Sequence, residues 1–352
     1  MGMIRGNIPM KPYTAADVAR IAGVSQSTVS YVLSGRRPIS ADTRRRVQDV
    51  IERLTYEPNH GARALASQET RVIGLVVPFD TAADQAGLIP FIDTIATTLR
   101  EKDYDLLLIT SREGTQGLSR IARRRLCDGI ILMEAKAFDD DRIDIAVELG
   151  VPVVMIGIPN EHEGLTCVDL DFESASRLVI DEFANTAHDR VALIGYPAAM
   201  TEMGLNFVHR LTTTARAQAA DRGLKYTEIS PIEFGRAGAR SAVEQIQAVH
   251  SPKERLGVFL AGSHSLDQVV PMLSAAGLAP GTDLSLIALT TDDDAADADP
   301  PVSNVALDPR QVSLRAMRML FELLEHRGVG EERIELVPTR LTHRATVMDP
   351  LG

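Results

Sequence analysis

The chain has 352 residues, of which 45% are hydrophobic and 24% charged, and it carries a formal net charge of -11. This composition predicts a soluble globular protein of about two or three domains. Two cysteines are too few for a disulfide scaffold, and apolar runs such as 151–158 are too short to span a bilayer. No secretory signal is visible, so we expect a cytoplasmic protein with no membrane partner.

Charge is distributed unevenly along the chain. Residues 1–71 contain 11 Lys and Arg against 6 Asp and Glu, a formal charge of +5, whereas the remaining residues contain 26 against 42, or -16. This asymmetry indicates a small basic module attached to an acidic body. The negative total therefore does not exclude binding to nucleic acid, because only the face that meets the phosphates matters.

Capping residues predict three short helices near the N-terminus. Thr14 can cap the first helix, with Asp17 at its third position, and Gly23 then interrupts the chain. Ser25 can cap the second helix, and Ser40 the third. The predicted helices span 15–22, 26–34 and 41–55.

Two short helices joined by a glycine-containing turn and braced by a third are typical of a helix-turn-helix unit. An alternative is a plain three-helix cap on a larger domain, but the outer face of the second helix is uncharged and rich in hydrogen-bonding groups. The side chains expected to pack inward are Ala15, Val18, Ala19, Ala22, Val24, Val29, Val32, Leu33, Val47, Val50, Ile51 and Leu54.

The segment from Thr14 to about Ser67 resembles the headpiece and hinge of the LacI/GalR family of bacterial transcriptional regulators. The family's Y-x-P-N and A-R-x-L motifs recur as Tyr56, Pro58, Asn59, Ala62, Arg63 and Leu65. The resemblance implies a hinge helix over 59–66 that becomes ordered on operator DNA, with Leu65 as the wedge that opens a base step in the minor groove. An ordinary linker leucine is the alternative for Leu65.

The same resemblance implies which residues contact double-stranded operator DNA. Gln26, Ser27 and Tyr31 are expected to face the bases, and Tyr31 stands where the family commonly has Arg, which predicts a different base preference there. Arginines at 36, 37 and 44–46 suit phosphate contacts. The predicted DNA-binding residues are Thr14, Ser25, Gln26, Ser27, Thr28, Ser30, Tyr31, Ser34, Arg36, Thr43, Asn59, Ala62, Arg63 and Leu65.

From residue 72 onward, nearly continuous apolar runs alternate with amphipathic helices, a pattern typical of parallel sheets covered on both faces. The alternation occurs twice, so we expect an α/β body of two doubly wound lobes that bind ligands at the carboxyl ends of their strands. Strands are predicted at 72–78, 104–110, 129–133, 152–158, 190–196, 256–262 and 284–290, and helices at 89–102, 142–149 and 173–184.

The order of elements resembles the periplasmic-binding-protein-like effector domain that follows a LacI-type headpiece. This resemblance implies a headpiece at 1–57, a hinge helix and linker at 58–71, and an effector-binding and dimerisation domain at 72–352. By the same resemblance the lobes interleave. The first is expected to comprise about 72–169 and 309–333, and the second about 170–305 and 334–348.

The expected effector site departs from the family pattern. Arg210 matches an Arg that relatives use on ligands, but other positions differ from the family. Gly157 stands where relatives often have Asp, Thr290 where they have an acid, Gly262 and Ser263 where they have Asn-Asp, and Thr213 where they have Gly. A hexose held in the usual way is disfavoured, because each buried hydroxyl without a partner costs roughly 1–3 kcal/mol. For His264 a plain surface or crevice role is the alternative. The predicted effector-binding residues are Phe79, Asp80, Glu134, Arg210, Ser263, His264 and Thr290.

Enzyme and metal signatures were sought along the whole chain. There is no G-x-S-x-G elbow, P-loop or G-x-G-x-x-G after a strand. The run Asp292–Asp294, with Asp297 and Asp299, could hold a hard cation, but a solvated acidic loop is favoured. We therefore expect a non-enzyme without cofactor or metal.

These patterns predict a dimeric, sequence-specific transcriptional repressor, controlled by a sugar-like small-molecule effector. A homodimer is expected because the chain lacks the leucine-heptad tail of tetrameric relatives. The alternative is a cytoplasmic small-molecule receptor whose N-terminal helices are only structural.

Overall fold

A computed structural model describes most of the chain as two compact units, residues 1–71 and 72–352. None of the described helices is long and apolar enough to cross a membrane. The described residues are 13–34, 37–56, 69–77, 85–110, 113–162, 164–231, 233–261, 266–326 and 332–349.

The first unit holds three helices, α1 (Ala15–Ala22), α2 (Gln26–Ser34) and α3 (Ala41–Leu54). A capping box starts α1: the amide of Asp17 donates to Thr14 Oγ1 at 3.3 Å, and the amide of Thr14 donates to Asp17 Oδ2 at 3.0 Å. Two orphan amides are satisfied in this way, which fixes where the helix begins.

An apolar core joins the three helices. Most of its members were predicted from helical periodicity, but Tyr56 was not, because it follows α3 rather than lying on it. The residues of α2 that are buried in this core are Val29 and Val32, so the opposite face of the helix stays exposed. The buried side chains are Val18, Ala19, Ala22, Val29, Val32, Val47, Val50 and Tyr56.

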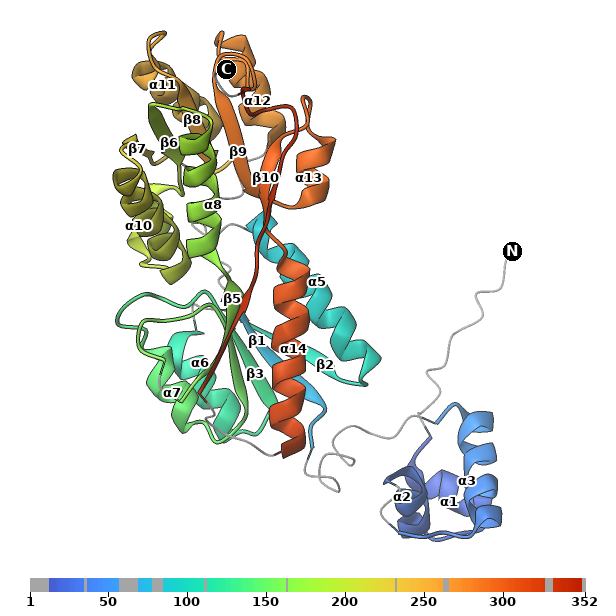
Figure 1. Cartoon of the computed structure of the whole chain (residues 1–352). Coiled ribbons are helices and arrows are strands. Elements are labelled where there is room, and N and C mark those ends of the chain that lie inside the picture. The colour runs from blue at the N-terminus through green and yellow to red at the C-terminus, as the bar shows by residue number, and fades with distance from the viewer. Residues whose placement is uncertain are drawn as a thin grey trace, which may run out of the picture. The chain divides into compact units, whose positions relative to one another are not determined.

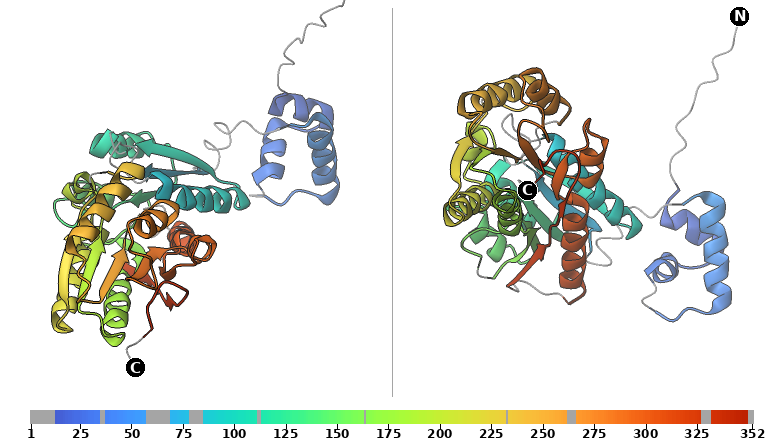
Figure 2. Two further views of the ribbon diagram at one scale, coloured as in Figure 1. Left: turned by 90° about the horizontal axis from the view of Figure 1, so that it is seen from above. Right: turned by 45° about the horizontal axis from the view of Figure 1, so that its top comes forward.

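The second unit contains two six-stranded sheets (Figure 1). The first sheet has the order β11-β5-β4-β3-β1-β2, and all its neighbouring strands are parallel. Helices α5 (Gln85–Glu101) and α14 (Pro309–His326) pack together over one face (Figure 2). Helices α6 (Gly114–Arg123) and α7 (Arg142–Glu148) cover the other. The strands are β1 (Val72–Val77), β2 (Asp105–Thr110), β3 (Gly129–Met133), β4 (Val153–Ile156), β5 (Thr166–Leu170) and β11 (Arg333–Val337).

The second sheet has the order β12-β10-β9-β8-β6-β7, in which only the β10–β12 pair is antiparallel. Helices α8 (Phe172–Asn185) and α10 (Asn206–Asp221) pack together on one face, and α11 (Arg236–Val249) and α12 (Leu266–Ala275) on the other. The remaining elements are β6 (Arg190–Ile194), β7 (Lys225–Ile229), β8 (Leu256–Leu260), β9 (Ser285–Thr290), β10 (Ser303–Ala306), β12 (Leu341–Thr342), α9 (Ala198–Glu202) and α13 (Asp292–Asp297).

Two parallel-sheet lobes confirm the predicted fold class, but one expected lobe boundary is wrong. The segment 334–348 was assigned to the second lobe, whereas β11 lies in register with β5 from Arg333–Thr166 to Val337–Leu170. The first lobe therefore extends to Val337. Strand β11 is an edge strand whose sequence lacks the continuous apolar run of the inner strands, because the ion-paired Arg333 and Glu335 alternate with its apolar residues.

Candidate functional site

The N-terminal half of α2 presents a row of uncharged hydrogen-bonding side chains. Ser25 Oγ accepts the amide of Thr28 at 3.1 Å, and it lies 2.8 Å from each of the hydroxyls of Ser27 and Thr28. This cap holds the first turn of the helix in place. The exposed side chains of this face are Ser25, Gln26, Ser27 and Ser30, whereas Val29 and Val32 are buried beneath them.

Tyr31 is half-buried and has an arginine beside it. The guanidinium carbon of Arg37 lies 5.0 Å from the centroid of the Tyr31 ring, within the range of a cation–π contact. The sequence showed both residues but not that they are paired. The base-facing role of Tyr31 stays a prediction.

Two other predicted DNA-binding residues serve as parts of helix caps. The Thr14 hydroxyl donates to Asp17 at 2.8 Å, and the Ser40 hydroxyl donates to Thr43 Oγ1 at 2.9 Å. Ser34 is the last residue of α2. Five predicted DNA-binding residues lie outside the described part of the chain: Arg36, Asn59, Ala62, Arg63 and Leu65.

A cavity of about 110 Å³ lies where the carboxyl ends of strands from both sheets meet. In doubly wound folds this is the edge at which ligands bind, as the sequence analysis expected. Both lobes contribute to its lining, which consists of Gly87, Leu88, Phe91, Met133, Glu134, Ala135, Ile156, Gly157, Asp169, Phe172, Tyr196, Met200, Phe207 and Leu307.

Aromatic side chains form much of the cavity wall. The rings of Tyr196 and Phe207 meet edge to face with centroids 5.3 Å apart, and those of Phe172 and Phe207 lie 5.4 Å apart at 32°. None of these three residues was predicted to belong to the site. Phe172 and Tyr196 each stand two residues after the end of a strand, β5 and β6, and that position is the signal that could have identified them.

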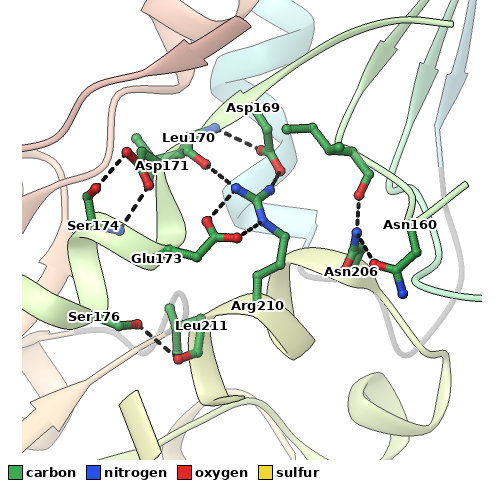
Figure 3. Close-up of polar contacts among 11 residues, drawn as sticks. Asn160, Asp169, Leu170, Asp171, Glu173, Ser174, Ser176, Asn206, Arg210 and Leu211 are labelled. Atoms are coloured by element: carbon green, nitrogen blue, oxygen red, sulfur yellow. Dashed lines mark hydrogen bonds and ion pairs between the residues drawn. The ribbon is translucent and has the colours of Figure 1, made fainter. Parts of the chain in front are cut away.

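An ion-pair network borders the cavity (Figure 3). Arg210 on α10 donates from Nη1 to Asp169 Oδ2 at 2.7 Å, and from Nε and Nη2 to the two oxygens of Glu173 at 2.7 and 2.6 Å. Asp169 belongs to the first sheet, whereas Arg210 and Glu173 are on helices that cover the second. The network therefore joins the two lobes.

The two carboxylates of this network titrate differently. Burial raises the pKa of Asp169 to about 7, although the attraction of Arg210 opposes the shift. For Glu173, burial alone would raise the pKa, but hydrogen bonds from Arg210 outweigh it and the pKa is lowered. Arg210 was predicted to bind an effector directly. In the structure its donors face acceptors of the protein itself, and Asp169 rather than Arg210 lines the cavity.

Glu134, a predicted effector-binding residue, does line the cavity. Its backbone is left-handed, with φ 56°, a conformation that a non-glycine residue adopts only when its surroundings hold it there. Arg142 holds the turn, because its Nη1 donates to the carbonyl of Met133 at 2.9 Å and its Nη2 to that of Glu134 at 2.6 Å.

The structure explains why one expected acidic side chain is missing. Gly157 lines the cavity with φ 118°, and a Cβ at this position would lie 3.0 Å from both the amide nitrogen and the Cβ of Ala135. A larger side chain would require the backbone of both segments to shift. At this point of the cavity wall the backbone of Gly157 packs closely against Ala135, and no polar side chain is present.

Hydrogen bonds also connect the lobes beside this wall. The amide of Asn206 donates to the carbonyl of Ala135 at 2.9 Å, and the amide of Ala137 donates to the carbonyl of Gly204 at 2.7 Å. The side-chain amide of Asn206 donates to the carbonyl of Ile158 (Figure 3). These contacts join loops of the first lobe to Gly204 and to the first residue of α10 in the second, so they help to set the separation of the lobes.

Comparison with known proteins accounts for both units. Residues 14–59 match the family described as bacterial regulatory proteins, lacI family, and residues 180–347 match a periplasmic binding protein-like domain. The first unit is therefore a lacI-family headpiece, and the second contains a periplasmic binding protein-like domain. Catabolite control protein A of Priestia megaterium is 25% identical over 335 residues, which are 94% of this chain and 98% of that protein.

Solved structures show the same fold as this chain. The lac repressor dimer bound to operator and the anti-inducer ONPF gives a TM-score of 0.79 at 19% identity, covering 96% of this chain and 100% of that one. The complex of the transcriptional regulator CelR with cellobiose gives a TM-score of 0.62 at 22% identity, covering 95% of this chain and 99% of that one. These matches confirm the predicted fold.

The remaining predicted effector residues, and the other positions that depart from the family pattern, are not part of the cavity lining or lie outside the described residues. The carbonyl of Thr290, at the end of β9, accepts the amide of the cavity residue Leu307 at 2.9 Å, but Thr290 itself is not part of the lining. Thr213 lies on α10. Outside the described residues lie Phe79, Asp80, Gly262, Ser263 and His264.

The acidic run that starts at Asp292 begins a helix. Thr291 caps α13, accepting the amide of Asp294 at 3.1 Å, and Asp292 pairs with Arg340. Acidic residues in a first turn suit the helix dipole. In the part of the chain that the structure describes, no group of three or more His, Cys, Asp or Glu side chains is arranged to hold a metal ion.

Proposed function

We propose that this protein is a lacI-family, sequence-specific transcriptional repressor that binds a near-palindromic operator and responds to a small molecule held between its lobes. The exposed face of α2 carries the proposal. Its Gln26, Ser27 and Ser30 are uncharged, lie on a rigid three-helix core, and belong to a segment of formal charge +5. Polar side chains of this kind can read base edges in the major groove.

The proposal divides the contacts with DNA into two kinds. Arginines on α3, of which Arg45 and Arg46 are exposed, suit phosphate oxygens and would position the module without reading sequence. The residues of α2 would then supply the base preference. Loss of an arginine should weaken binding to every sequence equally, whereas loss of a base-reading side chain should change the preference.

We propose a homodimer, because two identical headpieces on successive half-sites would match a near-palindromic operator. The solved lac repressor dimer on its operator, which has the same fold, supports this assembly. In a dimer the separation of the two headpieces must fit the spacing of the half-sites. Movement of the lobes that alters this separation would therefore alter affinity for DNA.

The cavity between the lobes is the proposed control site. It is walled by both lobes and bordered by the Asp169–Arg210 pair and the Asn206–Ala135 hydrogen bond. A molecule bound there contacts both lobes and so favours one separation over another. The resulting coupling must be reciprocal: operator DNA should change affinity for the effector by the same factor. The CelR–cellobiose complex supports a small-molecule occupant.

A selection of binding sites from randomised duplex DNA, using the full chain, tests the proposal. We expect a two-fold symmetric site whose binding weakens steeply with salt, because phosphate contacts release counterions. Gln26→Ala should lower the preference at one base pair of each half-site. Gln48→Ala, a change at an exposed glutamine of α3, is the matched control and should leave the selected site unaltered. Failure to enrich any sequence would overturn the proposal.

A small-molecule receptor whose N-terminal helices are only structural is the competing function. It predicts that the full chain binds small molecules while showing no salt-dependent, sequence-selective binding to DNA. Gel shifts with fragments from upstream of its own coding sequence separate the two functions. We place the repressor first because an uncharged, exposed row of side chains in a basic segment has no evident use in a receptor.

A further inference from the structure

We propose that the molecule bound between the lobes is a small organic cation, such as a quaternary ammonium or a protonated amine. This inference rests on the proposed function only in taking the cavity as the effector site. It names the chemical class of the effector from the residues that form the wall, and it departs from the sugar-like molecule expected from the sequence.

The first observation is the concentration of aromatic rings. The chain contains nine Phe, six Tyr and no Trp, yet three of the Phe and one of the Tyr line this single cavity. The face of an aromatic ring carries partial negative charge, so several rings around one space attract a cation. Recognition of quaternary ammonium groups by aromatic cages uses this attraction.

The second observation is the sign of the charge in the wall. Among the described lining residues, two are charged, Glu134 and Asp169, and both are acidic. Of the two arginines behind the wall, Arg142 is paired with Asp140, and Arg210 is paired with Asp169 and with both oxygens of Glu173. Arg210 and its two acids together keep a formal charge of one negative unit when both acids are ionised. An anion would therefore meet repulsion, and a cation attraction.

The same wall is poorly suited to a sugar. Most of its side chains are apolar, and Gly157 fills with backbone the position at which an acidic side chain would accept hydrogen bonds. Each sugar hydroxyl buried without a partner weakens binding. A quaternary ammonium needs no hydrogen bond, and the aromatic faces together with Glu134 and Asp169 can offset the cost of taking its charge out of water.

Calorimetric titration of the full chain with choline and with 3,3-dimethylbutan-1-ol tests the charge directly, because the two molecules differ only in having nitrogen or carbon at the centre of the branched end. Phenethylamine and 2-phenylethanol form a second pair. We expect each cation to bind more tightly than its neutral partner by about tenfold or more. Equal affinities within both pairs, or no binding by any of the four, would overturn the proposal.

Variants show whether the preference for cations comes from the cavity or from the negative charge of the protein as a whole. Phe207→Leu removes an aromatic face at similar size and should abolish most of the preference, and Phe91→Leu serves if the first variant does not fold. Phe321→Leu, at a ring that packs against Tyr104 away from the cavity, is the control and should keep the preference. A preference that survives both cavity substitutions would also overturn the proposal.

Site selection from DNA with the same protein preparations distinguishes a failure of the repressor proposal from a failure of the cation proposal. If the protein selects a symmetric operator but shows no preference for cations, only the ligand class is wrong. If it selects no DNA sequence, the repressor assignment fails whatever the calorimetry shows.

Discussion

Arg210 Nη1 lies 2.7 Å from Asp169 Oδ2, and this ion pair connects the helix-covered face of one lobe to a strand of the other. Both side chains are about nine-tenths buried. A buried pair contributes little net stability, because taking two charges out of water is costly. Removing one partner lowers stability strongly, because the other charge then stays buried without an opposite charge beside it.

Replacing Arg210 should therefore destabilise the effector domain strongly. We expect Arg210→Met to lower the free energy of unfolding by about 3 kcal/mol, since it leaves both Asp169 and Glu173 without their cation. Urea denaturation of the full chain measures this. Arg318→Met, at an exposed pair with Glu322, is the control and should cost less than about 1 kcal/mol. Similar losses in the two variants would contradict the network's special role.

Affinity for choline should rise with pH. Burial raises the pKa of Asp169 to about 7, so this carboxyl is mostly neutral at pH 6 and mostly ionised at pH 8, and only the ionised form attracts a cation. The charged groups facing it are Arg210 and Glu173, and Glu134 lines the same cavity. The pKa of Glu173 is lowered, so Glu173 stays ionised throughout this range.

Choline itself does not titrate between pH 6 and 8, so any change in its affinity reports on the protein. The expected gain in affinity over this range is up to about tenfold, the limit for one titrating group of pKa about 7. In Asp169→Asn the dependence should disappear. A pH profile that is equally steep in this variant would assign the effect to another group.

Acid should destabilise the protein through His188. Burial lowers the pKa of His188 to about 4 from its usual 6.5, and its Nε2 lies 2.8 Å from the hydroxyl of Ser285, which already accepts the amide of Met348. The unfolded chain takes up a proton below pH 6.5, but the folded chain does so only near pH 4. Stability is therefore fully present above pH 6.5 and is lost as the pH falls towards 4.

The size of this loss is on the order of 3 kcal/mol for a side chain that is 5% exposed. Urea midpoints at pH 7, 6, 5 and 4 measure it. His188→Gln should flatten the profile over this interval, whatever it does to absolute stability, whereas His326→Gln, at an exposed helix end, should follow the original profile. An unchanged slope in His188→Gln would show that other groups cause the acid sensitivity.

The close packing at Gly157 should make the cavity wall sensitive to a single methyl group. Gly157→Ala combines an unfavourable φ of 118° with contacts of 3.0 Å to Ala135, and we expect a loss of about 3 kcal/mol. Gly223→Ala has a φ of 72° and open space around the new Cβ, so it should lose only about 1–2 kcal/mol. Thermal unfolding of both variants compares backbone strain alone, at Gly223, with backbone strain and contact with Ala135 together, at Gly157. Equal losses of stability would mean that Ala135 moves away from the new methyl group.

Tyr31→Arg should change which base pair the headpiece prefers at one position of each half-site, because Arg can form two hydrogen bonds to guanine. Site selection with the variant protein measures the change. Arg45→Ala is the comparison: it should weaken binding to all sequences and lower the salt dependence by about one counterion. If Tyr31→Arg leaves the selected sequence unaltered, Tyr31 does not read bases and serves instead as the platform on which Arg37 packs.

The headpiece could be predicted closely because its determinants are local. A cap such as Thr14 with Asp17 and an apolar stripe such as Val18, Ala19 and Ala22 act within a few residues of each other, so the sequence displays them side by side. The positions of the three helices followed from the caps, and the face that each helix buries followed from the apolar stripe. Tyr56 was missed as a core residue because it packs from beyond the last helix.

The cavity could be placed but its lining could not. Strand ends were recognisable, and with them the edge of the sheet at which a ligand would bind. Which side chains meet there depends on the strand order and on the angle between lobes, and neither is visible in the sequence. Asp169 and Phe207 are far apart in the chain, and only the three-dimensional fold brings them to one wall. Strand β11 was misassigned because the family resemblance implied a crossover after residue 333, and only the pairing of β11 with β5 places it after Val337.

The position of β11 in the first sheet has a consequence for biosynthesis. This strand completes the edge beside β5, yet the ribosome makes it after every parallel strand of the second sheet. During translation one edge of β5 therefore stays unpaired until β11 is made. Helix α14, which covers the same sheet, is also made after the strands of the second sheet that precede it in the chain. Open edges invite pairing with other chains. A nascent chain released before residue 337 would lack the strand that closes its first lobe, so the two lobes must mature together.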